Sequence, residues 1–342
     1  MERVREALAL LGRGRSLTAE GAHAAIGEIM GGQVPEPLIA GLLAAWHVRG
    51  ETDEELAGAV RAARERMEPF EGDFPPLLDT CGTGGDGAST LNVSTAAALV
   101  VSCCGVAVAK HGNRSASGNS GSAEVLAELG VSIEADPALL RRGLREYSIA
   151  FLFAPRFHPA ARHAAPVRKL LPFRTIFNLI GPLANPARPA YQLIGVPDVE
   201  LAGRLARALA RLGVARAAVV AGADGLDEVS ISGPTEAFWI EAVAIHRETW
   251  TPEDFGISAT PAPDIRVSGP ADSARRIRAI LDGQAGPARD VVLANSAAAL
   301  RVAGRVDSLR EGVGLAASAI DSGEALRKLE AWAKLTNGVG PA

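Results

Sequence analysis

The sequence predicts a small α-helical domain followed by a larger α/β domain, built on a mostly parallel sheet with helices on both faces. Three observations support this fold class. Residues 1–70 contain helical patterns that no β-branched run interrupts. From residue 71 onward, short apolar runs alternate with helical stretches, which is the pattern of βαβ units. The chain has 342 residues, more than one compact domain usually holds, so its length fits two domains.

The helical domain is predicted from amphipathic stretches and their end signals. SLTAEGAHAAIGEIMGG is a short amphipathic helix that ends in a double glycine, and VPEPLIAGLLAAWHVRG is an apolar helix closed by Gly50. A third helix begins with the pattern Thr52-x-x-Glu55, in which each side chain caps a backbone N–H of the other residue. We expect residues 1–70 to form this domain.

Six strands are predicted in the α/β domain from short apolar runs: Leu77–Thr80, Val106–Lys110, Ala150–Phe153, Tyr191–Val196, Ala217–Ala221 and Ala237–Ile240. Four of the helices expected between them are Thr95–Cys104, Ser122–Leu129, Pro137–Glu146 and Val199–Leu212. Residues 165–187 are proline-rich and helical, and we expect them to fold back onto the helical domain. The α/β domain is therefore expected to comprise residues 71–164 and 188–342, with a mostly helical tail from about 272 to 337.

Composition excludes several function classes. Hydrophobic residues make up 48% of the chain and charged residues 22%, which is ordinary for a globular protein with an ample core. The net charge of −4 suggests no nucleic-acid or membrane surface, and no apolar run approaches the roughly 20 residues of a spanning helix. Cys81, Cys103 and Cys104 lack metal-binding spacing. We expect a cytoplasmic protein with reduced thiols and no nucleic-acid or membrane partner.

The first chemical signal is the stretch DTCGTGGDGASTLNVSTAAALVVSCC, residues 79–104. A glycine-rich loop between a strand and a helix lets backbone N–H groups approach an anion, and the helix start adds a positive dipole end. Ser94 and Thr95 add hydroxyls at that helix start. The loop therefore predicts a phosphate ligand, although its spacing matches neither the P-loop nor the dinucleotide fingerprint. The alternative is a plain connector with Ser94 as the N-cap.

A second polar loop, in VAVAKHGNRSASGNSGSAEVL, repeats this arrangement. The predicted strand ends at Lys110, and the loop leads to a helix that starts near Ser122. Both loops are expected at the carboxyl edge of one sheet, where α/β folds bind ligands. Only four of the 35 basic residues are lysine, so a lysine here indicates that the site requires a compact ammonium rather than a guanidinium. The alternatives are solvated loop charges at Lys110 and Arg114 and a buried, hydrogen-bonded imidazole at His111.

A third signal is the acidic pair Asp227-Glu228 in GADGLDEVSISGPT, which follows another predicted strand. Adjacent carboxylates near two phosphate-binding loops suggest Mg²⁺, which takes one or two carboxylates together with phosphate oxygens. Exposed surface charge is the alternative for such a pair.

The fourth segment is FLFAPRFHPAARHAAPVRKLLPFRTIFNLIGPLANP. Its Arg168 could bind a carboxylate with both arms of the guanidinium, while Phe157, His158 and Pro182 could form the wall of an aromatic pocket. The alternative is that these side chains pack helices together.

Together the four segments resemble the anthranilate phosphoribosyltransferase family, the second-step enzymes of tryptophan biosynthesis. The matching patterns lie between about residues 78 and 232 and include GTGGD, NVST, KHGNRS, LFAPRFHPA, APVRK, RTIFNL and DEVS. The resemblance implies a mixed, mainly parallel sheet and a homodimer formed through the helical domain. It also implies transfer of the 5-phosphoribosyl group from 5-phosphoribosyl-1-pyrophosphate (PRPP) to the amine of anthranilate, with two Mg²⁺ ions per active site.

The resemblance assigns site residues by position. Those expected to bind PRPP are Gly82, Gly85, Asp86, Thr90, Asn92, Val93, Ser94, Thr95, Lys110, His111, Gly112, Asn113, Arg114, Ser115, Ala116, Ser117, Gly118 and Ser122. Those expected to bind anthranilate are Gly82, Asn113, His158 and Arg168, and those expected to hold magnesium are Ser94, Asp227 and Glu228. Lys110, Asp227 and Glu228 are the expected catalytic residues. The chain departs from the family pattern at Gly118, where a second serine is frequent, and at Glu124, where aspartate is usual.

Two other functions are alternatives to this one. Pyrimidine nucleoside phosphorylases share the architecture, but their lysine loop has the pattern Lys-x-Ser-x-Gly-Gly rather than KHGNRS. A non-catalytic, nucleic-acid-binding relative should lack the acidic pair and carry a basic surface. Asp227-Glu228 and the net charge of −4 disfavour that second alternative.

Overall fold

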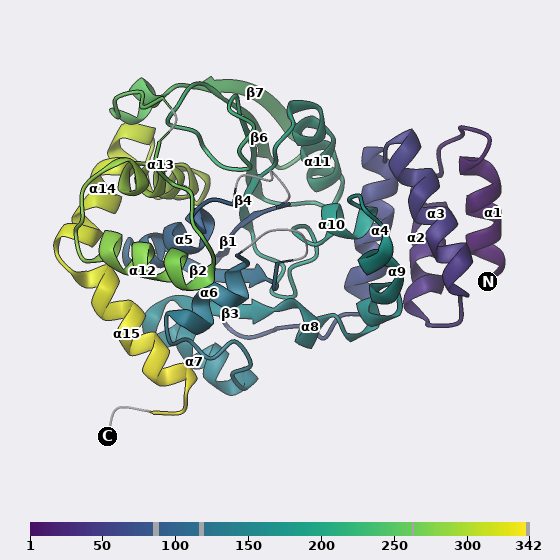
Figure 1. Ribbon diagram of the computed structural model, residues 1–342, viewed down its shortest axis with the longest axis horizontal. Helices are drawn as coiled ribbons and strands as arrows, with labels where there is room; N and C mark the ends of the chain where they lie inside the picture. The colour runs from purple at the N-terminus through teal and green to yellow at the C-terminus, as the bar shows by residue number, and fades with distance from the viewer. Residues whose placement is uncertain (85–88, 116–119, 262, 340–342) are drawn as a thin grey trace.

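The computed structural model describes residues 1–84, 89–115, 120–261 and 263–339. Four helices form one end of the molecule in Figure 1: α1 (Glu2–Leu11), α2 (Ala19–Met30), α3 (Glu36–Arg49) and α4 (Asp53–Glu65). The predicted capping box of α4 is confirmed, because Thr52 Oγ1 accepts from Glu55 N at 3.2 Å and Glu55 Oε2 accepts from Thr52 N at 2.8 Å. None of the described helices is long and apolar enough to cross a membrane.

A seven-stranded sheet has the order β3-β2-β1-β4-β5-β6-β7. Its strands are β1 (Leu77–Gly82), β2 (Ala107–Gly112), β3 (Ile149–Phe153), β4 (Tyr191–Gly195), β5 (Arg216–Gly222), β6 (Thr235–Glu241) and β7 (Ala244–Trp250). The first five pair in parallel, whereas β5–β6 and β6–β7 pair antiparallel. The mixed, mainly parallel sheet and the six predicted strands are confirmed. The edge strand β7 was not predicted, because its sequence AIHRETW is largely exposed and contains no apolar run.

The sheet separates two layers of helices. Alternate side chains of β5 face opposite sides, so Ala218 and Val220 join one core and Ala217 and Val219 the other. The first core also contains residues of α5 (Val93–Cys103), α6 (Ser122–Glu128), α12 (Pro270–Leu281), α13 (Pro287–Val302), α14 (Leu309–Asp321) and α15 (Glu324–Thr336). The second face is covered by α11 (Val199–Arg211) and the N-terminal helices. On the same face, α7 (Pro137–Tyr147) covers β2 and β3. The described part of the chain also contains two 3₁₀ turns, η1 (Pro159–His163) and η2 (Pro252–Phe255).

An inserted segment connects β3 to β4 and lies against the helical end of the molecule. It contains α8 (Ala154–Phe157), α9 (Ala165–Leu170) and α10 (Ile176–Ile180), and the last two confirm the helical character predicted for residues 165–187. Val167 of α9 and Ile176 of α10 share the second core with residues of α3 and α4, and Figure 1 shows α9 beside these helices. The segment thus extends from the helical end of the molecule toward the carboxyl edge of the sheet.

Candidate functional site

The strand order reverses at β1, because the chain moves from β1 to β2 and β3 on one side and returns to β4 on the other. Open α/β sheets bind ligands in the crevice outside the carboxyl ends of such strands. A pocket of about 510 Å³ lies at this position. Its wall combines both glycine-rich loops, the acidic pair and the inserted segment, so the four predicted segments meet at one place.

The predicted site residues fall into three groups. Those that line the pocket are Gly82, Thr90, Asn92, Ser94, Lys110, His111, Gly112, Asn113, Arg114, Ser115, Ser122, Arg168, Asp227 and Glu228. Those that lie elsewhere are Val93, Thr95 and His158. Those outside the described residues are Gly85, Asp86, Ala116, Ser117 and Gly118. Val93 and Thr95 are buried in α5 because successive helical residues point about 100° apart, so only Ser94 of the three faces the pocket.

Two glycines let the acidic loop enter the crevice. Gly82 at the end of β1 pairs in register with Gly195 at the end of β4. A Cβ at Gly195 would lie 1.6 Å from the backbone oxygen of Asp227, and one at Gly82 would lie 2.5 Å from Asp227 Oδ2. Any side chain at Gly195 is therefore excluded by backbone, not by a side chain that could turn away. Gly195 was missed in the sequence, where it ends a strand without any loop motif.

The acidic pair is held by backbone donors of the first loop. Asp227 Oδ2 accepts from Gly84 N at 2.8 Å, and Glu228 Oε1 accepts from Ser94 N at 3.2 Å, at the start of α5. These oxygens are the hard ligands that Mg²⁺ prefers, and Ser94 is adjacent. Within the described ranges no group of three or more His, Cys, Asp or Glu side chains could hold a metal. The pair therefore suits an ion that takes its remaining ligands from a hydroxyl, water and phosphate oxygens.

Lys110 is buried between β1 and α5, with only 3% of its surface exposed. Its ammonium donates to Thr80 O and, at 3.2 Å, to Ser94 Oγ. Burial lowers the pKa of Lys110, while the nearby Asp79 and Glu228 carboxylates oppose this shift. Two oxygen atoms, one from β1 and one from α5, thus hold the ammonium in place.

Asp79 supports the end of β2 and was missed as a site residue in the sequence. It is completely buried, and burial raises its pKa to about 6. Its Oδ1 accepts from His111 N at 3.1 Å and its Oδ2 accepts from Asn185 Nδ2 at 2.8 Å. The signal was an aspartate inside the apolar run LLDT, but its partner Asn185 lies 106 residues away. Asp79 and Asn185 together fix the backbone that carries Lys110.

His111 and His158 form a buried pair whose ring centroids are 5.1 Å apart. Burial lowers the pKa of His111 to about 3 and that of His158 to about 4, so both rings are neutral at pH 7. His111 lines the pocket, whereas His158 lies behind it. Phe157, expected in the pocket wall, instead packs edge-to-face on Phe70 in the core, with ring centroids 5.9 Å apart.

Arg168 is a cation of the pocket wall with no counterion among the described residues. Its guanidinium lies over the Phe177 ring at 5.4 Å, and its side chain has no hydrogen-bond or ion-pair partner in the described part of the chain. Burial lowers the pKa of Arg168. Phe177, Pro182 and a second arginine, Arg174, line the same wall. Of these, Arg174 and Phe177 were not predicted, because a single arginine or phenylalanine in RTIFNL carries no distinctive signal.

Two family models match the chain, each over one part of it. Residues 5–67 match the model described as "Glycosyl transferase family, helical bundle domain". Residues 74–326 match the model described as "Glycosyl transferase family, a/b domain". The second match covers the sheet and every residue that lines the pocket.

Individual relatives agree along nearly the whole chain. An anthranilate phosphoribosyltransferase of Thermomicrobium roseum is 48% identical over 333 residues, 96% of each chain. The crystal structure of the enzyme of that name from Thermus thermophilus is 41% identical, with a TM-score of 0.91 over 98% of this chain and 100% of its own. The Saccharomyces cerevisiae enzyme in complex with PRPP and Mg is 28% identical, with a TM-score of 0.90 over 98% of both chains. Given this identity over nearly its full length, the chain belongs to the anthranilate phosphoribosyltransferase family.

Proposed function

We propose that the pocket transfers the 5-phosphoribosyl group from PRPP to the amine of anthranilate, releasing pyrophosphate and forming N-(5-phosphoribosyl)anthranilate. This is the second step of tryptophan biosynthesis from chorismate. The observation that carries the proposal is the meeting, in one pocket, of two glycine-rich loops, an acidic pair and a partly buried arginine that has no counterion among the described residues. The first three suit a phosphorylated donor, and the arginine suits a carboxylate acceptor.

The donor half of the site is formed by the two loops. The loops before α5 and α6 both line the pocket, and Lys110 and Arg114 add positive charge that suits phosphate oxygens. We assign two Mg²⁺ ions to Ser94, Asp227 and Glu228 together with PRPP; when bound, such ions stabilise charge on the departing pyrophosphate. Lys110 stabilises the same charge from a fixed position, since its hydrogen bonds already hold the ammonium in place.

The acceptor half comprises Gly82, Asn113 and Arg168. His158 supports this half from behind His111, against which its ring packs. The aniline nitrogen is nucleophilic while neutral, so the transfer needs no strong protein base. His111 and His158, with pKa values of about 3 and about 4, are poor bases at pH 7. The proton released from the amine then passes to the carboxylate of the substrate or to water.

We propose further that the protein is a cytoplasmic homodimer that associates through its helical end. Two large apolar side chains support this surface, because Val48 is 85% exposed and Leu170 is 81% exposed on the neighbouring helices α3 and α9. The free thiols Cys81, Cys103 and Cys104 suit a reducing compartment. Light scattering on the purified protein measures the oligomeric state.

Loss of anthranilate fluorescence tests the reaction, with PRPP and Mg²⁺ each present or omitted. We expect turnover only when both are present. Asp227→Asn with Glu228→Gln should lower turnover on the order of 10²-fold or more, as expected for a lost charge stabiliser. Rates like those of the wild type at limiting Mg²⁺ in this double variant would contradict the role of the pair.

A further inference from the structure

We propose that Ser273, in the first turn of α12, is a positioning residue for the PRPP donor. It lies 181 residues from Asn92 in the chain, yet it holds Asn92 in place and through it links the two phosphate loops. The inference rests on the proposed function, because it assigns Ser273 to the donor half of that site.

The hydrogen bonds form a continuous chain from α12 to both loops. Ser273 is completely buried, and its Oγ donates to Asn92 Oδ1 at 2.8 Å and accepts from Asn92 N at 3.2 Å. On its other side, Asn92 Oδ1 accepts from Ser120 Oγ at 2.7 Å, and Asn92 Nδ2 donates to Ser120 O at 3.2 Å. Asn92 and Ser120 both line the pocket. The Ser273 hydroxyl therefore fixes the side chain that joins the first loop to the second.

The segment that leads into α12 also holds the end of the first loop; we name residues 264–273 the clasp. Thr90 forms an isolated antiparallel bridge with Arg266. Leu91 N donates to Ile265 O, and Val267 N donates to Ser89 O, both at 2.8 Å. Ser89 has φ +50°, which is uncommon for a residue with a side chain and needs support from its surroundings. The clasp supplies this support by backbone hydrogen bonds.

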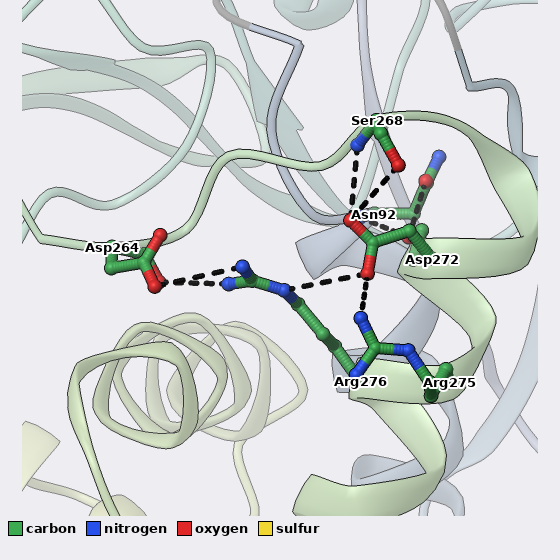
Figure 2. A network of polar contacts seen from close by, with 7 residues as sticks. Asn92, Asp264, Ser268, Asp272, Arg275 and Arg276 are labelled. Atoms are coloured by element: carbon green, nitrogen blue, oxygen red, sulfur yellow. Dashed lines mark hydrogen bonds and ion pairs between the residues drawn. The ribbon is translucent and has the colours of Figure 1, made fainter.

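The start of α12 is itself firmly attached, as Figure 2 shows. Asp272 accepts from Ser268 N at 3.0 Å and from Ser268 Oγ at 3.3 Å, and it forms ion pairs with Arg275 and Arg276. Arg276 also pairs with Asp264, at 3.5 Å. These contacts join the two ends of the clasp, so Ser273 extends from a segment of α12 that is held in place. Ser273 can thus set the position of Asn92 rather than follow it.

Loss of the Ser273 hydroxyl should affect the donor more than the acceptor. Asn92 would lose two hydrogen bonds and would sample more rotamers, and PRPP binding would have to restore its order. The acceptor wall carries Arg168 on the inserted segment and has no described contact with the clasp. If Ser273 only packed the fold, loss of its hydroxyl would instead weaken the binding of both substrates and lower the stability of the protein.

Steady-state kinetics of Ser273→Ala test the proposal, together with calorimetry of PRPP binding in the presence of Mg²⁺. We expect KM and Kd for PRPP to rise about tenfold, equivalent to about 1.4 kcal/mol, which is the range of one or two net hydrogen bonds. KM for anthranilate and kcat should each change less than about twofold, a split that mere packing would not produce. Ser273→Thr keeps the hydroxyl, so its KM for PRPP should return toward that of the wild type.

Ser318→Ala is the control, because it removes an exposed serine hydroxyl of α14 that donates to Gly314 O, outside the clasp and both loops. Its KM values should equal those of the wild type. An unchanged KM for PRPP in Ser273→Ala, or equal losses for both substrates with a lower Tm, would overturn the role of Ser273. Failure of the wild-type protein to consume anthranilate with PRPP and Mg²⁺ would instead refute the proposed function, and the two failures are therefore distinguishable.

Discussion

At the residue scale, Lys110 is a buried cation whose role should depend on its shape as well as on its charge. Replacement by arginine keeps the charge, but a planar guanidinium does not fit a position where one ammonium meets both Thr80 O and Ser94 Oγ. We expect Lys110→Arg to weaken PRPP binding on the order of tenfold or more, since the larger group must displace packed atoms. Calorimetry with PRPP and Mg²⁺ measures this change. An unchanged affinity would mean that Lys110 has no specific task in the pocket.

Arg168 allows a sharper test of acceptor selection. Arg168→Ala should raise KM for anthranilate roughly ten- to a hundredfold, the range of charge-assisted hydrogen bonds, while KM for PRPP changes little. Selectivity for anthranilate over aniline should fall in parallel, because only the acid loses its partner.

The Tm of Arg168→Ala should stay close to that of the wild type, because the guanidinium has no hydrogen-bond or ion-pair partner in the described structure. Arg162→Ala, an exposed change in the same segment, provides the control. Equal losses for both substrates together with a lower Tm would show that Arg168 packs the inserted segment instead.

The predictability of individual site residues follows the distance between partners in the chain. Ser94 and Lys110 belong to local glycine-rich patterns, and each was predicted from its own loop. Asp79 and Ser273 depend on partners 106 and 181 residues away, and no local pattern indicates those partners. The roles given to the predicted site residues stay predictions until the variants above are measured.

At the scale of elements, the capping box of α4 is also an anchor for the helical end of the chain. Glu55 is completely buried, and besides Thr52 it accepts from Leu17 N at 2.7 Å and pairs with Arg49. Thr52→Ala removes one cap and should cost about 1 kcal/mol of unfolding free energy. Glu55→Ala leaves Arg49 without its buried partner and should cost about 3–5 kcal/mol. Thermal melts of both variants measure these losses, and Glu55→Ala should have the lower Tm. Equal Tm values would show that Glu55 acts only as a cap.

Elements were predicted well wherever burial was strong. β1 to β5 are buried on both faces and appear in the sequence as apolar runs. β7 is an exposed edge strand, and its sequence AIHRETW has neither an apolar run nor an alternation of polar and apolar residues, so no local pattern indicates it. The capping box was visible in the sequence, but the additional contacts of Glu55 were not, because they join it to Leu17 in the loop before α2 and to Arg49 of α3.

At the scale of the whole molecule, three buried groups, His111, His158 and Asp79, make stability depend on pH. The folded pKa values of His111 and His158, about 3 and about 4, lie below the value of about 6.5 in unfolded chains. The unfolded chain therefore binds about two protons near pH 6 that the folded chain does not bind. Stability falls as the pH is lowered through this range. Asp79, with a folded pKa of about 6, acts in the opposite direction between about pH 4 and 6.

For these three groups the net difference near pH 5 is about one proton, so their contribution to the free energy of unfolding should fall by about 1.4 kcal/mol for each unit by which the pH is lowered. Urea unfolding at pH 7, 6 and 5 measures this slope. His158→Gln should remove about one proton from the difference and flatten the curve. A slope that His158→Gln leaves unchanged would show that His158 takes up its proton normally in the folded protein.

The general architecture was predictable because the alternation of strands and helices repeats over most of the chain. The division into residues 1–70 with 165–187, and 71–164 with 188–342, stays a prediction. Packing does not separate the two domains at these boundaries, because one core joins α3 and α4 to α10, α11 and four sheet strands. Local sequence patterns indicate where elements begin and end, but not which elements share a core.

The close approach of Gly195 to the main chain of Asp227 has a consequence for the evolution of new specificities. The atoms that face Gly195 belong to the main chain, so no side chain can move aside and even a methyl group is excluded there. The donor side of the pocket therefore has little freedom to drift. The facing wall, with Arg168, Phe177 and Pro182, consists of side chains that can change one at a time. Acceptance of substituted anthranilates should arise through this wall, so that the acceptor can diversify while the phosphoribosyl donor stays the same.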